Sequence, residues 1–382
     1  MDLPNLPGLL AARVTAIEAS GIRKIFDLAA TVKDAVNLSI GQPDFDVPAP
    51  IANAAIEAIR DGFNRYPPSI GIPELRRLIL GRAFEVHGVR QEDCLVTSGS
   101  SGGLTLAYLA LLNPGDEILI PDPYFVSYKH LATMCGASAV LYDTYPHFRV
   151  TAAEVEKRIT PRTKAIVAMS PGNPTGACIA ERDKQDLAGL ARARGLILIS
   201  DEIYELFSYA GPIGPDGGER SFGALYPEGT LVVGGLSKTV AITGWRLGWV
   251  TGPKFLIEEL TKLQQFTFVS ANSTAQRAAL GAFKLDLSPY VNAYKKKRDF
   301  LLKALREAGY ECEEPGGAFY LFPRVPKKYA NGQAFVEAAT AKRLLLVPGH
   351  VFSARDTHFR ISYAASDATL QQAAEIFKAL NT

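Results

Sequence analysis

The sequence predicts an α/β fold, with a mostly parallel sheet between helices and a smaller α/β unit after it. Short, continuous apolar runs alternate with longer helical patterns from about residue 90 to 255. Uninterrupted apolar strands are typical of parallel sheets that are covered on both faces. After about residue 285 the pattern changes, and helical stretches alternate with a few short extended segments. At 382 residues the chain is long enough for about two domains.

Seven apolar runs are expected to form the strands of the sheet. They are Cys94–Thr97, Glu117–Pro121, Ala137–Leu141, Ala165–Met169, Leu196–Ser200, Leu231–Gly234 and Leu247–Thr251. Amphipathic stretches between them, such as Ser101–Leu112 and Glu181–Arg194, are expected to be helices. In such a sheet the functional groups gather beyond the carboxyl ends of the strands, so candidate residues are sought there.

The C-terminal part is expected to be a smaller α/β domain. Helices are predicted at Tyr290–Ala308, Gln333–Lys342 and Thr369–Leu380, and extended segments at Ala318–Pro323, Leu344–Val347 and Thr357–Ser362. The run Gly41-Gln42-Pro43-Asp44 marks the crossing into the large domain. We therefore divide the chain into an N-terminal segment that packs with the small domain (residues 1–40), a large domain (41–285) and the small domain (286–382).

Composition argues against several kinds of partner. The formal charge is +2, from 41 basic and 39 acidic residues, so no nucleic acid or membrane partner is expected. The basic run Lys295–Arg298 is interpreted as a solvated helix face. No signal peptide is apparent, and the apolar stretch Leu104–Leu112 is far shorter than the about 20 residues of a membrane span.

The positions of the histidines and cysteines indicate whether a metal site or disulfide bonds are to be expected. The five histidines are scattered, so no metal site is expected. The cysteines lie far apart and form no CxxC pair; they are Cys94, Cys135, Cys178 and Cys312. This usage is typical of reduced thiols in a cytoplasmic protein.

Four segments at predicted strand ends carry the side chains that indicate chemistry. They are Ser170–Gly176, Ser200–Tyr204, Ser237-Lys238 with Arg246 eight residues further on, and Phe359–Ala364. Lys238 follows an apolar strand in a Gly/Ser-rich turn, the kind of turn that approaches a phosphate closely. A lysine held rigidly there can form a Schiff base with a carbonyl. Arg246 suits a phosphate clamp, and Asp201, at the end of a buried strand, needs a cation such as a protonated pyridine nitrogen.

Each feature alone also has an ordinary structural explanation. A lone lysine usually lies on the solvated surface, and a strand-end aspartate can cap a helix. The segment Asn173–Gly176 alone is a simple turn, and Arg360 alone suits a surface ion pair. Their occurrence together, in this order and at strand ends, favours one shared site.

With these residues in place, the chain resembles the class I and II aminotransferases, in the aspartate-aminotransferase fold type (fold type I) of pyridoxal-phosphate enzymes. The resemblance runs from about Asn37 to the C-terminus. It is carried by Ser39–Phe45, Tyr66–Arg76, Pro121–Phe125, Ser170–Gly176, Asp201–Tyr204, Ser237–Gly248, Pro315–Tyr320 and Arg360. It implies a mostly parallel seven-stranded sheet with a smaller α/β domain, pyridoxal 5′-phosphate as cofactor, and amino acids and 2-oxo acids as substrates.

The resemblance implies roles around the cofactor ring. Lys238 would carry the cofactor as a Schiff base and later move the substrate proton. Asp201 would keep the ring nitrogen protonated. Asn173 and Tyr204 would hydrogen-bond the ring oxygen, and Phe125 would stack on the ring face.

It also implies roles for the phosphate and the substrate. The phosphate would be bound by Ser100, Ser101, Ser237 and Arg246. Arg360 would bind the substrate α-carboxylate, helped by Asn173 and the backbone N–H of Gly41. Tyr66 would reach the phosphate of the neighbouring subunit's cofactor, so the resemblance implies a homodimer.

Two positions depart from many relatives. Gly235 stands where a serine three residues before the lysine would donate to the phosphate, so that bond is missing or is supplied by a neighbour or water. Phe125 stands where many aspartate-specific relatives have tryptophan, and phenylalanine lacks the indole N–H donor. A second cation for a distal carboxylate is not evident, since Arg23, Arg65 and Arg277 are unassigned candidates. We therefore favour neutral or aromatic amino donors, with 2-oxoglutarate or pyruvate as acceptor.

Two other functions remain open from the sequence. A carbon–sulfur lyase or an enzyme like aminocyclopropane-carboxylate synthase would use the same lysine, aspartate and arginine. A DNA-binding regulator with an aminotransferase-like domain would need a winged-helix module before Gly41. Only 40 residues precede Gly41, and they contain no basic recognition helix.

Overall fold

A central seven-stranded sheet organises the computed structural model, which describes residues 6–19, 21–23, 25, 32–209 and 220–381. The strand order is β2-β8-β7-β6-β5-β3-β4. Only β8 runs antiparallel to its neighbours; the other adjacent pairs are parallel. The strands are β2 (Asp93–Ser98), β3 (Glu117–Asp122), β4 (Ser138–Asp143), β5 (Thr163–Met169), β6 (Ile197–Asp201), β7 (Thr230–Gly235) and β8 (Leu247–Gly252). The predicted fold class is confirmed.

The seven predicted strands coincide with the seven observed ones, apart from shifts of one or two residues at their ends. The reason is burial on both faces. Every residue of β3, β7 and β8 is buried, which is why these segments read as continuous apolar runs.

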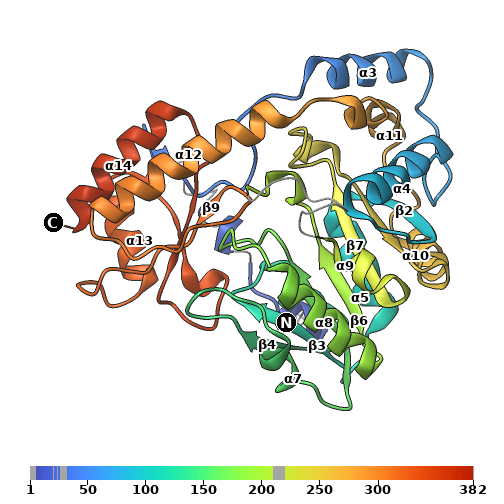
Figure 1. The fold of residues 1–382 in the computed structure, drawn as a ribbon, viewed down its shortest axis with the longest axis horizontal. Coiled ribbons are helices and arrows are strands. Elements are labelled where there is room, and N and C mark those ends of the chain that lie inside the picture. The colour runs from blue at the N-terminus through green and yellow to red at the C-terminus, as the bar shows by residue number, and fades with distance from the viewer. Residues whose placement is uncertain (1–5, 20, 24, 26–31, 210–219, 382) are drawn as a thin grey trace, which may run out of the picture.

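Helices cover both faces of the sheet (Figure 1). On one face α5 (Gly99–Leu111) and α10 (Lys254–Thr267) contact β2 and β8. On the other face α8 (Glu181–Arg194) contacts β6. Successive residues of β6 alternate between two apolar clusters, with Ile199 on the α5 side and Leu198 on the α8 side.

The remaining elements of this part of the chain are shorter or lie at its edges. The helices are α3 (Ala49–Arg60), α4 (Pro73–His87), α6 (Ser127–Met134), α7 (Ala152–Glu156), α9 (Phe222–Leu225) and α11 (Ser273–Ala279). The 3-10 turns are η2 (Glu205–Phe207), η3 (Pro227–Gly229), η4 (Thr243–Trp245) and η5 (Ala282–Lys284).

The C-terminal part is reached through one long helix, α12 (Ser288–Glu307), which crosses the molecule in Figure 1. After α12, this part of the chain contains α13 (Gly332–Ala341), η6 (Gly349–Val351) and α14 (Asp367–Asn381). Its antiparallel sheet has the order β11-β12-β9, from Val347–Pro348, Phe359–Ser362 and Tyr320–Leu321. The strand β1 (Val36–Asn37) pairs with β10 (Leu344–Leu345), so the chain just before residue 40 lies on C-terminal strands.

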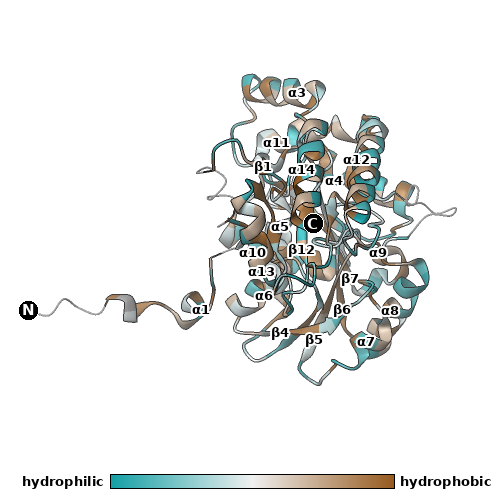
Figure 2. Ribbon diagram, turned by 90° about the vertical axis from the view of Figure 1, so that its left-hand side faces the viewer, coloured by the Kyte–Doolittle hydropathy of each residue, from teal (hydrophilic) through white to brown (hydrophobic). Residues whose placement is uncertain are grey.

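The first described segment, with η1 (Leu6–Leu9) and α1 (Ala12–Thr15), extends away from the rest of the molecule (Figure 2). Its apolar side chains are exposed, with 80% of Leu9 and 55% of Val14 accessible. No helix in the described ranges is long and apolar enough to cross a membrane.

The basic run on α12 differs from the prediction. Lys295 and Lys296 are exposed, as expected for a solvated face. Arg298, however, is buried and donates to the carbonyl of Pro315 at 2.9 Å, and its guanidinium lies 4.9 Å from the centre of the Tyr209 ring. The interpretation as a wholly solvated face was therefore wrong for Arg298, because its planar head packs on an aromatic ring between the two parts of the chain.

Candidate active site

A pocket of about 270 Å³ opens beyond the carboxyl ends of β5, β6 and β7. All but one of the residues predicted for the site line this pocket. They are Gly41, Ser100, Ser101, Phe125, Asn173, Asp201, Tyr204, Ser237, Lys238, Arg246 and Arg360. The exception is Tyr66. The structure therefore brings together side chains that are spread over most of the sequence.

Lys238 follows the end of β7 and points into this pocket. Its amine donates a hydrogen bond to the carbonyl of Gly41 at 2.6 Å, which ties the cofactor-side turn to the N-terminal crossing segment. Burial lowers the pKa of Lys238 to about 8, and the nearby guanidinium groups of Arg360 and Arg246 act in the same direction. A lowered pKa makes the neutral, nucleophilic amine more accessible near neutral pH.

Asp201 is the last residue of β6, and only 2% of it is exposed. Its carboxylate accepts hydrogen bonds from the hydroxyl of Tyr128 at 2.7 Å and from the backbone N–H of Ile203 at 3.3 Å. Burial raises the pKa of Asp201 to about 6 despite these two bonds. A carboxylate in this position gains from a cation facing it, as the sequence predicted.

Asn173 and Tyr204 lie on the wall beside Asp201, and both are buried. The hydroxyl of Tyr204 lies 2.7 Å from the hydroxyl of Tyr320. Tyr320 belongs to β9 of the C-terminal part, so this contact closes the pocket between the two parts of the chain.

Arg360, on β12, is buried and has a fixed orientation. It donates to the side chain of Asn173 at 3.1 Å and to the carbonyl of Ser39 at 2.6 Å. Its guanidinium carbon lies 4.7 and 4.8 Å from the ring centres of Tyr320 and Phe352. Its Nε is buried without a hydrogen-bond partner in the described part of the chain. A buried guanidinium with an open donor suits a carboxylate ligand.

The turn that begins α5 lies directly against Arg246. Gly99 has a φ of +69°, and an added Cβ there would come within 2.5 Å of the Arg246 guanidinium. On the other side, a Cβ on Gly248 would come within 2.5 Å of the backbone of Gly99 and Ser100. This close packing places a guanidinium, two serines and the free N–H groups of a 13-residue helix around one point. This arrangement could hold an anion such as a phosphate.

Tyr66 lies elsewhere in the chain. It is 84% exposed and lines a separate shallow hollow with Arg65 and the segment 270–274. Within one chain the structure does not bring Tyr66 to the other site residues.

Sequence reasoning missed several residues of the pocket. Tyr320 belongs to the motif Pro315–Tyr320, but the sequence suggested no role for its side chain. Thr243 and Ile22 also line the pocket. Tyr128, which does not line it, donates a hydrogen bond from its hydroxyl to the carboxylate of Asp201. Tyr128 lies in the first turn of α6, three residues after Phe125, and its backbone N–H donates to the carbonyl of Phe125 at 3.0 Å. Its nearness in sequence to Phe125 is the one signal that could have found it.

No metal site was expected from the sequence, but one group of possible metal ligands lies together in the described part of the chain. His87, Glu202 and Glu205 offer ligand atoms within 4.8 Å of one another. Glu205, however, already pairs with His87 and with Arg82, whose Nη2 lies 3.2 Å from its carboxylate. Burial opposes charge on Glu205, but these two partners outweigh it and lower the pKa of its carboxyl to about 2. The acid therefore has two cationic partners of its own.

The chain matches known proteins over nearly its whole length. The family described as aminotransferase class I and II matches residues 33–377. The chain belongs to this family.

Relatives within it are similar at about a third identity. An aspartate aminotransferase from Pyrococcus abyssi is 35% identical over 95% of this chain and 96% of its own. An aromatic-amino-acid aminotransferase from Thermococcus litoralis is 33% identical over the same shares. The solved aspartate aminotransferase of Thermus thermophilus with maleate superimposes with a TM-score of 0.92, at 34% identity and covering 97% of this chain and 99% of that one.

The protein is a pyridoxal-phosphate-dependent transaminase. The pocket fits this cofactor on its own chemistry, with an amine at Lys238, a buried carboxylate at Asp201 and an anion site at the α5 turn. The names of these relatives favour transamination over the lyase and DNA-binding functions that the sequence left open.

Gly248→Ala is expected to weaken cofactor binding at least tenfold and to destabilise the fold by about 1–3 kcal/mol, because the added methyl group displaces the backbone of the α5 turn. Cofactor titration by absorbance and urea unfolding measure the two effects. Gly244→Ala is the matched control, since nothing lies within 4 Å of its added Cβ. Equal cofactor affinity in the two variants would contradict the close packing as a requirement for binding.

Proposed function

We propose that this transaminase moves the amino group of a neutral or aromatic L-amino acid to a 2-oxo acid such as 2-oxoglutarate or pyruvate, with Lys238, Asp201 and Tyr204 as its catalytic residues. One observation carries the proposal. The amine of Lys238, the carboxylate of Asp201 and the guanidinium of Arg360 line a single pocket of about 270 Å³.

The residues around the ring have distinct tasks. When bound, pyridoxal phosphate supplies an electron-accepting ring joined to the substrate's nitrogen. Lys238 attaches the cofactor through its amine and moves the proton of the substrate Cα. Asp201 holds the ring nitrogen protonated. The described groups that donate hydrogen bonds to its buried carboxylate, Tyr128 and the N–H of Ile203, are neutral, so the ring nitrogen also supplies the missing cation. Tyr204 and Asn173 donate to the ring oxygen, and Phe125 stacks on the ring face.

The phosphate is bound in this proposal by Ser100, Ser101, Ser237 and Arg246. Gly235 cannot be replaced by the serine of many relatives without a shift, because a Cβ there would lie 3.0 Å from Ile203 and 3.1 Å from the carbonyl of Leu247. Thr243 offers another hydroxyl on the pocket wall and is the neighbour that compensates.

Arg360 binds the α-carboxylate, with Asn173 and the backbone N–H of Gly41 beside it. Support comes from the open donor on its Nε and from its rigid stacking between two rings. Because a carboxylate is common to every donor and acceptor, this contact anchors all substrates alike.

Three observations support the preference for neutral or aromatic side chains. Among the described residues that line the pocket, the cations are Lys238, Arg246 and Arg360, and each has another task. The candidates Arg23, Arg65 and Arg277 do not line it, and Arg277 stacks on Phe63 at 4.9 Å. Ile22 adds an apolar wall.

We further propose a cytoplasmic homodimer with composite active sites. The hollow around Tyr66 is lined in part by residues 270–274, and the chain just before this segment has exposed apolar side chains, including Phe266 at 89% and Val269 at 43% accessible. A surface of this kind fits a partner subunit. All four cysteines are free thiols, which agrees with a reducing compartment. The division into residues 1–40, 41–285 and 286–382 remains our proposal for the domains.

Asp201→Asn is expected to keep the fold and to lower turnover on the order of 10²–10³-fold, because a neutral amide cannot hold the ring nitrogen protonated. Tyr128→Phe is the control: it removes one hydrogen bond from the carboxylate but keeps its charge, so its loss should be much smaller. Steady-state kinetics with saturating cofactor measure both. Near-wild-type turnover in Asp201→Asn would remove the electrostatic role from this residue.

A donor screen tests the substrate class. The cofactor-loaded enzyme is mixed with each amino acid, and the loss of its long-wavelength absorbance is followed. Neutral and aromatic donors should react at least about tenfold faster than aspartate and glutamate, since an unpaired distal carboxylate costs more than about 1.4 kcal/mol in the apolar wall. Arg360→Lys should slow all donors and acceptors together by about 2–4 kcal/mol, without changing their order.

If aspartate were the fastest donor, the preference would be wrong while transamination stood. If Arg360→Lys spared alanine and changed the order of the other donors, Arg360 would contact the side chain instead of the common carboxylate.

Tyr66 is tested by subunit complementation. A Lys238→Ala subunit and a Tyr66→Phe subunit each form homodimers with two impaired sites. In their heterodimer one site combines the intact Lys238 of one subunit with the intact Tyr66 of the other, so mixing and re-equilibration should restore activity. Lys238→Ala mixed with itself is the control. A strictly monomeric active enzyme, or no gain on mixing, would refute the composite site.

A further inference from the structure

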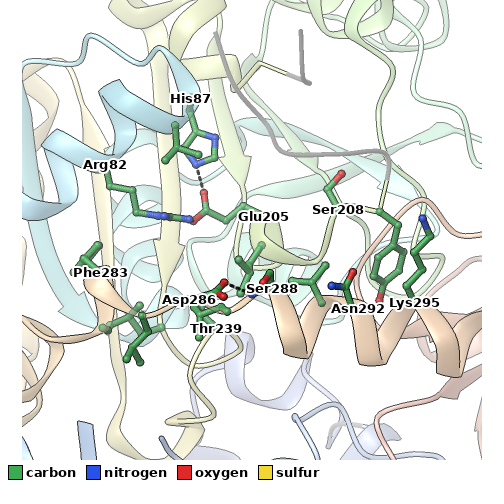
Figure 3. Close-up of a pocket in the computed structure, with 18 of the residues that line it drawn as sticks. Arg82, His87, Glu205, Ser208, Thr239, Phe283, Asp286, Ser288, Asn292 and Lys295 are labelled. Carbon is green, nitrogen blue, oxygen red and sulfur yellow. Dashed lines mark hydrogen bonds and ion pairs between the residues drawn. The ribbon is translucent and has the colours of Figure 1, made fainter. Parts of the chain in front are cut away.

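A second cavity, of about 590 Å³, is lined in part by Thr239, the residue that follows Lys238 in the sequence (Figure 3). We name it the α4–α12 cavity, because the C-terminal end of α4 and the first turns of α12 form two of its walls. The third wall is the chain around η2, and the fourth is the segment after β7. Its volume is in the range that holds a small organic molecule.

Most of the lining is apolar. The aliphatic and aromatic side chains include Val86, Leu206, Leu236, Trp249, Ala282, Phe283, Leu285, Leu287 and Val291. An occupant therefore gains most of its binding free energy from burying an apolar body of its own.

The charged groups on the α4 side already have partners. Arg82 and His87 both pair with Glu205. Burial disfavours charge on His87, but Glu205 outweighs it and raises the pKa of the imidazole. Asp286 accepts a hydrogen bond from the N–H of Ser288 at 3.0 Å. The Nδ1 of His87 is buried without a hydrogen-bond partner in the described part of the chain, but Arg82 and His87 on this wall both face the carboxylate of Glu205.

The opposite end of the cavity carries polar groups without such partners. The hydroxyl of Ser208 is buried and has no hydrogen-bond partner in the described part of the chain. Asn292 and Lys295, from α12, lie at the same end (Figure 3). The ammonium of Lys295 forms no ion pair with any described residue. A hydroxyl, an amide and an ammonium next to an apolar chamber form the recognition pattern for a carboxylate with a large apolar body.

The cavity shares its walls with the active site. Leu236 and Thr239 line it, and between them in sequence stand Ser237 and Lys238 of the cofactor pocket. Glu205 and Leu206 line it too, directly after Tyr204. A molecule in the cavity contacts the back of both catalytic segments and biases their position relative to Asp201.

From these observations we infer that the α4–α12 cavity is a regulatory site for an amphipathic monocarboxylate, with an aryl or alkyl body in the apolar chamber and its carboxylate on Ser208, Asn292 and Lys295. Occupancy changes turnover through the Lys238 segment. The amphipathic ligand needs no amino or keto group, so it is not itself a substrate.

The probes are 4-phenylbutyrate and octanoate, titrated into the cofactor-loaded enzyme by calorimetry and tested as modulators against varied amino donor. Both should bind and change kcat in a way that saturating donor does not overcome. Lys295→Gln and Ser208→Ala should each weaken binding about tenfold while basal activity stays unchanged. Lys296→Gln, an exposed neighbour on α12 that does not line the cavity, should bind like the wild type.

Four outcomes overturn the proposal. Binding that is purely competitive with the donor and lost in Arg360→Lys places the probes in the active site. Equal binding in Lys295→Gln, Ser208→Ala and wild type removes the anion end. Equal binding of 4-phenylbutanamide removes the requirement for a carboxylate. No binding at millimolar concentration removes the site altogether, without bearing on the transaminase activity.

Discussion

The burial of the Asp201 carboxylate is the constraint around which the site is built. Placing a charge at the end of a central strand is costly unless a cation faces it, and here burial raises the pKa of the group to about 6. The neighbouring strands meet that constraint by their order. Because β5, β6 and β7 run parallel, their carboxyl ends bring Asn173, Asp201 and Lys238 to one edge. In the proposed function, the protonated ring nitrogen of the cofactor is the cation that faces this carboxylate.

A second dependence links the two parts of the chain. Arg360 stands on a C-terminal strand, yet its two hydrogen bonds go to Ser39 and Asn173. Tyr320, from the same small sheet, meets Tyr204 at 2.7 Å. Arg360, for which we propose the substrate carboxylate, and the residues proposed to bind the cofactor are therefore positioned by one another. These hydrogen bonds also link the two parts of the chain across the site.

The sequence was informative where function coincides with strand ends. Continuous apolar runs located the sheet, and Lys238, Asp201 and Asn173 follow those runs directly, so their convergence was predictable. It was less informative where side chains meet from unrelated segments. The ion pair of His87 and Glu205 joins α4 to η2, and Arg298 turns inward from an otherwise solvated helix face. Neither has a local pattern. Tyr66 is a third case, since its proposed contact requires a second chain.

The single antiparallel strand of the sheet has a consequence for cofactor exchange. Because β8 returns beside β7, with Gly235 opposite Gly248, one connection of residues 236–246 carries both Lys238 and Arg246. The attachment points that we propose for the cofactor, covalent at Lys238 and ionic at Arg246, thus belong to the same short loop, which a two-stranded ladder closes at its base. Opening that loop would remove both of these attachment points while the sheet stays intact, and would leave the phosphate with Ser100 and Ser101 of the α5 turn. Loss and recharging of the coenzyme would then depend on a local opening and on the free coenzyme concentration, and not on refolding of the domain.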